Sequence, residues 1–228
     1  MATASFIKKS RKPIYENGKR VEYVSKKGKR EGETLSKIDR TIPRDEEDKI
    51  FIPVGGSYYT WSFQYGGTYY SKEKPRQSQL TQSNFLSQYY ALQESIEDFS
   101  PSEPDEIESF IEDMKSNIES LQDECQTALD NMPEQLQSAP TGELLQERID
   151  SLDSLSSELD DIDTDYEEPE DDDEDLLTEI AEEEGIEMGE DNWKEQITED
   201  MITDMKNAKS DEWIQERLEE IGGISFDL

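Results

Sequence analysis

The stretch SPSEPDEIESFIEDMKSNIESLQDECQTALDNMP, residues 100–133, decides the fold of the helical half of the chain. Its apolar side chains recur every three or four residues, the spacing that places them on one side of an α-helix. Ser100-Pro101-Ser102-Glu103 is typical of a capped helix start, and Met132-Pro133 indicates the end. The side chains of the stripe are Ile107, Phe110, Ile111, Met114, Ile118, Leu121, Cys125 and Leu129.

Two further apolar stripes flank this helix. Three stripes joined by short polar connections predict a helical hairpin or a three-helix bundle. We therefore expect a mainly α fold, in which a small N-terminal antiparallel β-hairpin region packs on the bundle within residues 50–162. Cys125 lies on the stripe, which favours a buried structural thiol. The flanking stripes are Phe85, Tyr89, Leu92, Ile96 and Phe99, then Leu145, Ile149, Leu152, Leu155, Leu159 and Ile162.

An acidic run follows the third stripe. Residues 158–191 contain 20 acidic residues and no basic one. Such a run repels itself, so residues 163–175 are predicted to be a disordered acidic linker. Residues 176–228 then form a predicted C-terminal helical segment of short helices, which either dock on each other or offer apolar side chains to a partner's groove. The candidate partner-binding residues are Trp193, Ile197, Met201, Trp213, Leu218 and Phe226.

The charge is divided unevenly along the chain. Residues 1–91 carry 17 Lys and Arg against 10 Asp and Glu, whereas residues 92–228 carry 6 against 48. The formal net charge of -35 excludes nonspecific binding of nucleic acid or an anionic membrane by the molecule as a whole. No stretch approaches the roughly 18 apolar residues that a membrane helix needs.

The residue types also limit the chemistry. The chain has no histidine and one cysteine, so it lacks the commonest general base and the commonest metal ligand. Asp161, Asp163 and Asp165 begin the spacing of a calcium-binding EF-hand loop, but Tyr166 stands where that loop needs glycine. We expect no catalytic residue, no metal site and no cofactor, hence no enzyme. A single cysteine, together with a polar Met1–Lys12 segment, favours a cytoplasmic location.

Residues 1–49 are predicted to be a basic, largely flexible arm with one possible hairpin. Pro13–Glu16 and Lys19–Val24 flank Asn17-Gly18, a pair favoured at two-residue hairpin turns because both central residues take positive φ. Residues 26–48 contain few apolar side chains, and we expect them to be mobile.

A stronger β-strand pattern occupies residues 50–70, with a turn at Gly66-Gly67. Alternation places Tyr59, Trp61 and Phe63 on one face, and Lys72, Lys74 and Arg76 follow directly. Two interpretations remain open. Either the aromatic face packs on the next helix, or it is a stacking platform for single-stranded nucleic acid whose backbone the basic residues contact.

Three stretches carry a family resemblance: FIKKSRK (6–12), GGTYYSKEKPRQSQLTQSNF (66–85) and TGELLQERID (141–150). They resemble an uncharacterised family of tailed-bacteriophage and related bacterial genomes, over residues 1–12 and 50–162. The resemblance implies that residues 13–49 are an insertion and that the tail beyond Asp165 lies outside it. Some relatives carry cysteine pairs around the hairpin, as a zinc ribbon would; this chain has none there, so zinc binding is not carried over. The family brings no established activity.

Three functions are open at this point. The first is a non-enzymatic, phage-type interaction protein that presents acidic helices to a basic, DNA-binding host or phage partner, with DNA mimicry as the limiting case; here the acidity could instead serve solubility alone. The second is a single-stranded nucleic-acid-binding module in residues 1–91, regulated by the acidic tail. The third is a phage assembly or structural protein. If the chain is phage-encoded, the expected location is the bacterial host cytoplasm.

Overall fold

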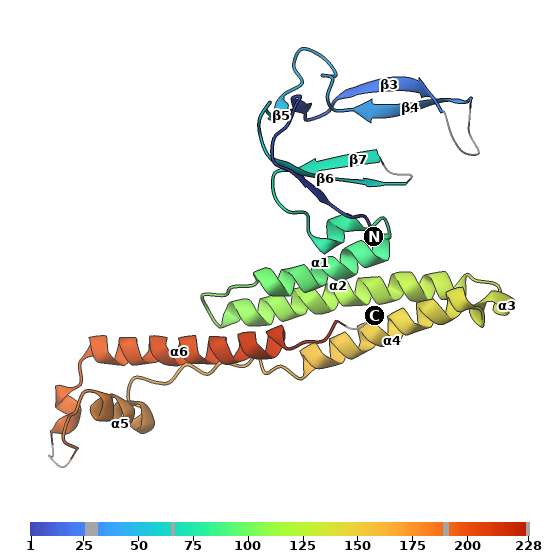
Figure 1. The fold of residues 1–228 in the computed structure, drawn as a ribbon. Coiled ribbons are helices and arrows are strands. Elements are labelled where there is room, and N and C mark those ends of the chain that lie inside the picture. The colour runs from blue at the N-terminus through green and yellow to red at the C-terminus, as the bar shows by residue number, and fades with distance from the viewer. Residues whose placement is uncertain (26–31, 65–66, 189–191, 227–228) are drawn as a thin grey trace. The chain divides into compact units, whose positions relative to one another are not determined.

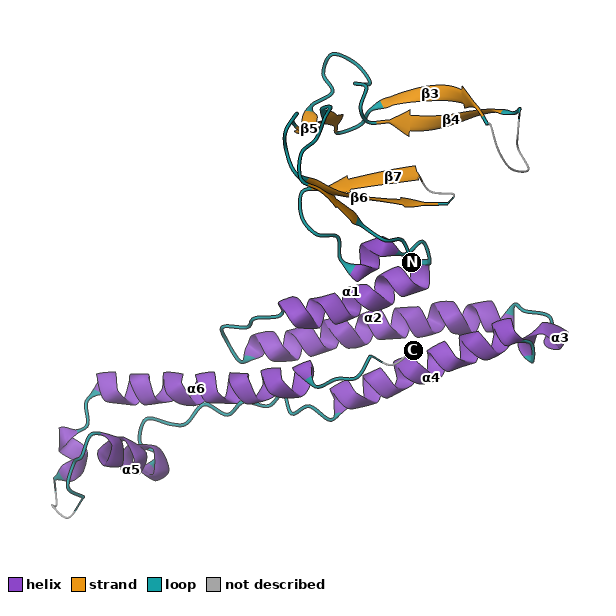
Figure 2. Cartoon of the chain, in the orientation of Figure 1, coloured by secondary structure: helices purple, strands orange, loops and turns teal. Residues whose placement is uncertain are grey.

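The computed structural model describes residues 1–25, 32–64, 67–188 and 192–226. The chain divides into two compact units, Met1–Ala91 and Leu92–Leu228. Strands occur in the first unit and long helices in the second (Figures 1 and 2). The described chain is therefore a mixed α and β structure, and the expectation of a mainly α fold needs correction: the β content is larger because residues 1–49 contribute strands.

The first unit contains three small antiparallel sheets among its described residues. The largest has the strand order β1-β6-β7, while β2 pairs with β5 and β3 pairs with β4. A 3-10 turn at Gln77–Leu80 then leads into α1, whose Phe85 and Tyr89 are buried. The strands are β1 (Ser5–Ile7), β2 (Ile14–Tyr15), β3 (Lys19–Val24), β4 (Thr34–Asp39), β5 (Ile50–Ile52), β6 (Tyr58–Phe63) and β7 (Gly67–Ser71).

Residues 1–49, predicted to be a largely flexible arm, contain the strands β1 to β4. The expected hairpin around Asn17-Gly18 is not formed. Gly18 has the positive φ of a turn, 73°, yet the strands on its two sides pair with other partners, β2 with β5 and β3 with β4. Of the residues expected to be mobile, 34–39 form β4 and 26–31 lie outside the described residues.

A buried carboxylate explains why the turn is used differently. Asp48 accepts hydrogen bonds from the backbone N–H groups of Asn17 (3.0 Å), Gly18 (2.8 Å) and Arg44 (2.8 Å), and from the Asn17 side-chain amide (3.0 Å). Burial by itself would raise the pKa of Asp48, but these donors outweigh it and lower the pKa to about 2. The carboxylate thus joins the Asn17-Gly18 turn to the loop before β5.

The second unit is built on a helical hairpin of α2 and α4, which lie side by side (Figure 1). The buried side chains of α2 are spaced four and three residues apart, the period of a coiled-coil seam. Burial of each contributes about 1.5–3 kcal/mol. Cys125 is one of them, which confirms the expected buried thiol. The helices are α1 (Asn84–Asp98), α2 (Asp105–Asp130), α3 (Glu134–Gln137), α4 (Pro140–Asp160), α5 (Glu174–Glu183) and α6 (Glu199–Gly222).

The C-terminal segment also differs from the prediction. The apolar stripes at residues 193–205 and 213–221 had suggested separate short helices, but one helix, α6, covers residues 199–222 and is preceded by a 3-10 turn at Trp193–Gln196. Its N-terminal half packs on α5, where Leu176, Ile180 and Met205 form a small buried cluster of their own. Periodicity suggested two helices because residues 206–212 contain no large apolar side chain, but they contain no glycine or proline either, and the helix continues through them.

The connection between α3 and α4 requires glycine at position 142. A Cβ on Gly142 would lie 2.0 Å from the Gln137 carbonyl oxygen. We predict that Gly142→Ala lowers the free energy of unfolding by about 1–3 kcal/mol, the usual cost of overpacking. Thermal unfolding of the full chain, compared with exposed Thr141→Ala, measures this. Equal melting temperatures for the two variants would contradict the close packing.

The Asp48 contacts make a second prediction. Since the folded-state pKa lies below the ordinary value of 3.8, the ionised carboxylate stabilises the fold above that pH, and the contribution is lost as pH falls through about 2. At pH 7 Asp48→Asn removes the charge and turns one acceptor into a donor. Hydrogen exchange should accelerate in residues 14–20 and 41–50 and stay unchanged in α2. Unchanged exchange in both segments would refute this role.

Candidate functional site

The outer surface of the α2–α4 hairpin is almost entirely anionic. The two helices carry nine and six carboxylates respectively, against Lys115 and Arg148 as their only cations. The carboxylates lie on the sides turned away from the seam and are exposed, apart from the half-buried Glu158. Lys115 Nζ pairs with Asp160 at 2.5 Å, so this cation is already engaged. The apolar seam on one side thus fixes an array of negative charge on the other.

A shallow hollow of about 330 Å³ opens at the start of α2. Phe110 forms part of its wall and stacks on Phe99, with ring centroids 3.8 Å apart. The Glu106 carboxylate accepts hydrogen bonds from the backbone N–H groups of Ser102 and Glu103 and so ties the loop before α2 to its first turn. These hydrogen bonds lower the pKa of Glu106, and the opposing effect of burial is smaller. The lining residues are Asp105, Glu106, Ser109, Phe110 and Asp113.

The predicted aromatic platform on β6 is filled by protein rings. Trp61 is 7% exposed and stacks on Tyr69 of β7, with centroids 5.7 Å apart. Phe63 meets the same Tyr69 edge-on at 5.5 Å, and Tyr59 packs on Phe6 of β1 at 4.9 Å. Trp61 therefore has no free face for a base. The following Lys72, Lys74 and Arg76 are exposed.

The opposite face of β6 and β7 combines aromatic rings with cations. Tyr58 and Tyr70 lie there with centroids 5.9 Å apart. Lys72 Nζ lies 5.1 Å from the centroid of the Phe51 ring, and the Arg40 guanidinium lies 5.2 Å from the same centroid. The guanidinium also lies 5.3 Å from the Tyr70 centroid. We call Arg40, Phe51, Tyr58, Tyr70 and Lys72 the cation–aromatic cluster.

Arg40 is held in this cluster by its backbone neighbours. Its Nε donates to the Tyr15 carbonyl at 2.6 Å. Burial lowers the pKa of Arg40, and the nearby Tyr70, Asp48 and Glu16 only partly offset that effect. Burial likewise raises the pKa of Tyr70. In the described part of the chain, neither Arg40 nor Lys72 forms a salt bridge with a carboxylate. Among the described residues, both cations therefore lack a carboxylate at salt-bridge distance.

The predicted partner-binding residues of the C-terminal segment are mostly in use within the chain. Ile197 and Met201 pack against the buried cluster of Leu176, Ile180 and Met205. Trp193 is half-buried, with Lys194 Nζ 5.5 Å from the centroid of its ring, and Leu218 and Phe226 are also half-buried. Trp213 lies between Tyr166 (5.3 Å) and the Arg217 guanidinium (5.5 Å).

The acidic segment between α4 and α5, predicted to be a disordered linker, has no helix or strand before Glu174, and two of its carboxylates pair with α6. Lys206 of α6 pairs with Glu168 (3.3 Å) and Asp171 (2.6 Å), and Lys209 pairs with Glu179 of α5. The side-chain hydrogen bond from Lys206 to Asp171 is the largest cause of the raised pKa of Lys206. The few cations of α6 thus neutralise part of the self-repulsion that led us to expect disorder.

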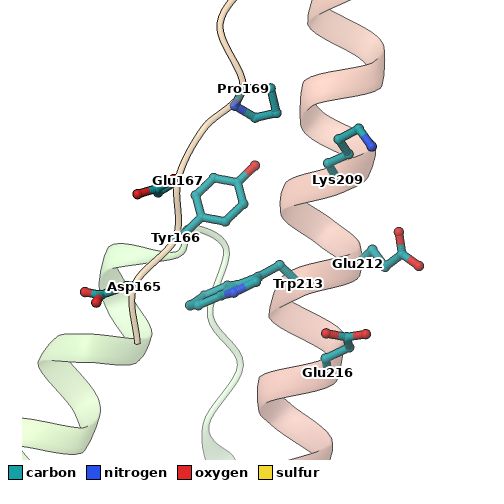
Figure 3. A pocket seen from close by; sticks show the side chains of 8 residues that line it. All are labelled: Asp165, Tyr166, Glu167, Pro169, Lys209, Glu212, Trp213 and Glu216. Atoms are coloured by element: carbon teal, nitrogen blue, oxygen red, sulfur yellow. The ribbon is translucent and has the colours of Figure 1, made fainter. Parts of the chain in front are cut away.

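An open hollow of about 400 Å³ lies between this segment and α6 (Figure 3). The Tyr166 ring lies against Trp213 there, and the carboxylates of Glu212 and Glu216 point outward from α6. The Tyr166 hydroxyl and Arg217 Nε are buried without a hydrogen-bond partner in the described structure, which weakens the contact. The lining residues are Asp165, Tyr166, Glu167, Pro169, Lys209, Glu212, Trp213 and Glu216.

The described residues contain no cluster of metal ligands and no membrane-spanning helix, and their thiol is buried. No group of three or more acidic or cysteine side chains there is placed to hold a metal ion. Burial raises the pKa of Cys125, which keeps the thiol protonated. None of the helices over the described ranges is both long and apolar enough to span a bilayer.

Sequence reasoning missed most of the cation–aromatic cluster and found only Lys72. The period-2 alternation that grouped Tyr59, Trp61 and Phe63 also places Tyr58 and Tyr70 together on the other face, a signal that was available. Arg40 and Phe51 had no such signal, because they reach the cluster from separate segments after β4 and in β5.

Comparison of the chain with protein-family models, with curated proteins and with solved structures found no match.

The lysine contacts of α6 yield a prediction. Lys206→Gln removes the contacts to Glu168 and Asp171 and leaves the acidic segment to its own repulsion. Hydrogen exchange in residues 163–183 should then accelerate roughly two- to fivefold, as expected for a partly exposed ion pair. Lys115→Gln, which alters the hairpin alone, should not change that segment. If both variants leave it unchanged, the lysine does not hold the segment on α6.

Proposed function

We propose that the protein is a non-enzymatic interaction protein whose α2–α4 hairpin binds a basic protein partner. The observation that carries the proposal is the array of fifteen carboxylates, all but Glu158 exposed, that the two helices present against two cations. The rigid seam beneath it means that a partner meets charges at fixed spacings, and fixed spacings are what distinguish recognition from general attraction.

The size of the charge argues against solubility as its sole purpose. A net charge of magnitude about 2–8 keeps a small domain soluble. Residues 92–228 carry 48 acidic against 6 basic side chains, several times that range. Such an excess destabilises a compact fold through self-repulsion. Its presence is more readily explained by a partner that relieves it.

The positions of the carboxylates point the same way. Glu108 and Glu112, and also Glu119 and Asp123, are like charges four residues apart on α2. Glu143 and Glu147 repeat the arrangement on α4. Each such pair destabilises a helix by about 0.2–0.5 kcal/mol. Lysine at one position of each pair would reverse the sign, so the surface is not arranged for helix stability.

The charge density is lower than that of DNA. Duplex DNA carries one charge per about 1.7 Å of axis, or about 23 over the ~39 Å length of a 26-residue helix. The hairpin helices carry fifteen carboxylates and two cations over a comparable length, a little over half that density. A protein that binds DNA through Lys and Arg fits this surface, since it contacts only a subset of phosphates. The phage-type motifs of the sequence accord with a host or phage DNA-binding partner.

The hollow at the start of α2 offers such a partner an anchor. Phe110 supplies an apolar wall, and Asp105 and Asp113 supply carboxylates within the same lining. A lysine or arginine side chain buries its aliphatic stem on such a wall while its charged end meets the carboxylates. We therefore place the centre of the binding surface on the first half of α2.

The proposal is tested by retention of basic proteins from a bacterial lysate on the immobilised full chain, at rising salt. The wild-type chain should retain a discrete basic protein at about 150 mM salt. A variant with four hairpin charges removed should bind that protein at least about fivefold more weakly, as four exposed pairs would predict. Its substitutions are Glu108→Gln, Glu112→Gln, Glu119→Gln and Asp123→Asn.

A matched control removes four charges outside the hairpin and should change the affinity less than twofold. Equal losses in the two variants would mean that bulk charge, not the hairpin surface, governs binding. Retention of no basic protein even at low salt would refute the function itself. The control substitutions are Asp161→Asn, Glu167→Gln, Glu170→Gln and Asp172→Asn.

A further inference from the structure

The proposed acidic interaction surface does not explain the cation–aromatic cluster. The cluster lies in the Met1–Ala91 unit, whose net charge is positive. Residues 1–91 carry 17 basic against 10 acidic side chains. Within the cluster, Arg40 and Lys72 converge on one ring, Phe51, at 5.2 and 5.1 Å. Both cations lie against that one ring, and no carboxylate of the described residues forms a salt bridge with either. An anionic ligand at this ring would supply a salt-bridge partner that the described residues do not.

The Asp39 carboxylate, which acts on the Tyr70 of the cluster, is already hydrogen-bonded. Asp39 accepts hydrogen bonds from the backbone N–H (2.9 Å) and the hydroxyl (2.7 Å) of Thr41. These hydrogen bonds are the largest causes of the lowered pKa of Asp39, and the nearby Lys37 and Lys12 lower it further. Two further lysines thus lie near Asp39, and the carboxylates of Asp39 and Asp48 are both engaged by backbone N–H groups.

Aromatic rings accompany the cations. Phe51, Tyr58 and Tyr70 are half-buried, so each keeps part of its surface open to solvent. Single-stranded nucleic acid is bound by cations that contact phosphates and by rings or guanidinium planes on which bases stack. A duplex offers its phosphates but keeps its bases stacked within the helix, and an acidic peptide offers no bases at all. The combination of rings and cations favours the single strand over both.

We propose that the cation–aromatic cluster binds single-stranded nucleic acid, with Arg40 and Lys72 on adjacent phosphates and bases against the open edges of Phe51, Tyr58 and Tyr70. This surface is the face of β6 and β7 opposite to the Trp61 face, whose rings pack on one another. It is independent of the acidic hairpin, and failure of either proposal leaves the other standing.

The test uses the full chain and a fluorescein-labelled 15-nucleotide single strand of mixed sequence, with binding measured by fluorescence anisotropy at 50–200 mM salt. Arg40→Gln with Lys72→Gln should weaken binding at least about tenfold, whereas Lys19→Gln with Arg20→Gln, the same charge change on β3, should weaken it less than threefold. Exposed Lys72→Gln alone guards against misfolding of the Arg40 variant. It should reduce the slope of log affinity against log salt by about 0.7, the value for one phosphate contact on a single strand.

A separate variant measures the contribution of base stacking to binding. Phe51→Leu keeps an apolar side chain but removes the ring, and should weaken binding several-fold with an unchanged salt slope. Four outcomes would overturn the proposal: no binding of the oligonucleotide at 50 mM salt, equal losses in the two charge-matched variants, binding of a duplex of the same sequence as tight as the single strand, or displacement of the oligonucleotide by a glutamate decapeptide at equal charge concentration.

Discussion

The apolar seam between α2 and α4 is the interaction on which the helical unit depends. Helices with like charges at four-residue spacing would be marginal on their own in water. The six buried side chains of α2, from Ile107 to Cys125, and the buried leucines of α4 supply the free energy that holds fifteen carboxylates in place. The acidic surface therefore depends on the seam: repulsion among the carboxylates is tolerated only because the buried side chains form a continuous seam.

The acidic segment shows a second way in which the same repulsion is managed. Four of the six cations of residues 92–228 lie between Lys194 and Arg217. Lys194, Lys206 and Lys209 each pair with a carboxylate between Glu168 and Glu179. A count of acidic residues between 158 and 191 gives no sign of this, because the neutralising charges come from a helix that begins later in the chain.

The sequence predicted the elements whose signal is local and missed those whose partners are distant. The stripe from Ile107 to Leu129 placed α2 and its buried thiol correctly, since helical periodicity is contained in one segment. In residues 1–49, β2 and β3 lie where a hairpin was predicted, but their partners are β5 and β4 and not each other. The strand β1 was missed because it pairs with the distant β6. Asn17-Gly18 turned as expected, but the Asp48 carboxylate thirty residues later decided what the turn joins. Arg40 was missed for the same reason.

The lone thiol has a practical consequence. Cys125 is the only cysteine of the chain, it is 4% exposed, and it lies in the seam near the end of α2. A thiol reagent can reach it only when the two helices separate, so its alkylation rate under native conditions reports the opening frequency of the hairpin. The unmodified protein thus carries a natural probe for the opening of the hairpin that bears the acidic surface. A ligand that binds this surface and stabilises the hairpin would slow the alkylation of Cys125 without contacting that residue.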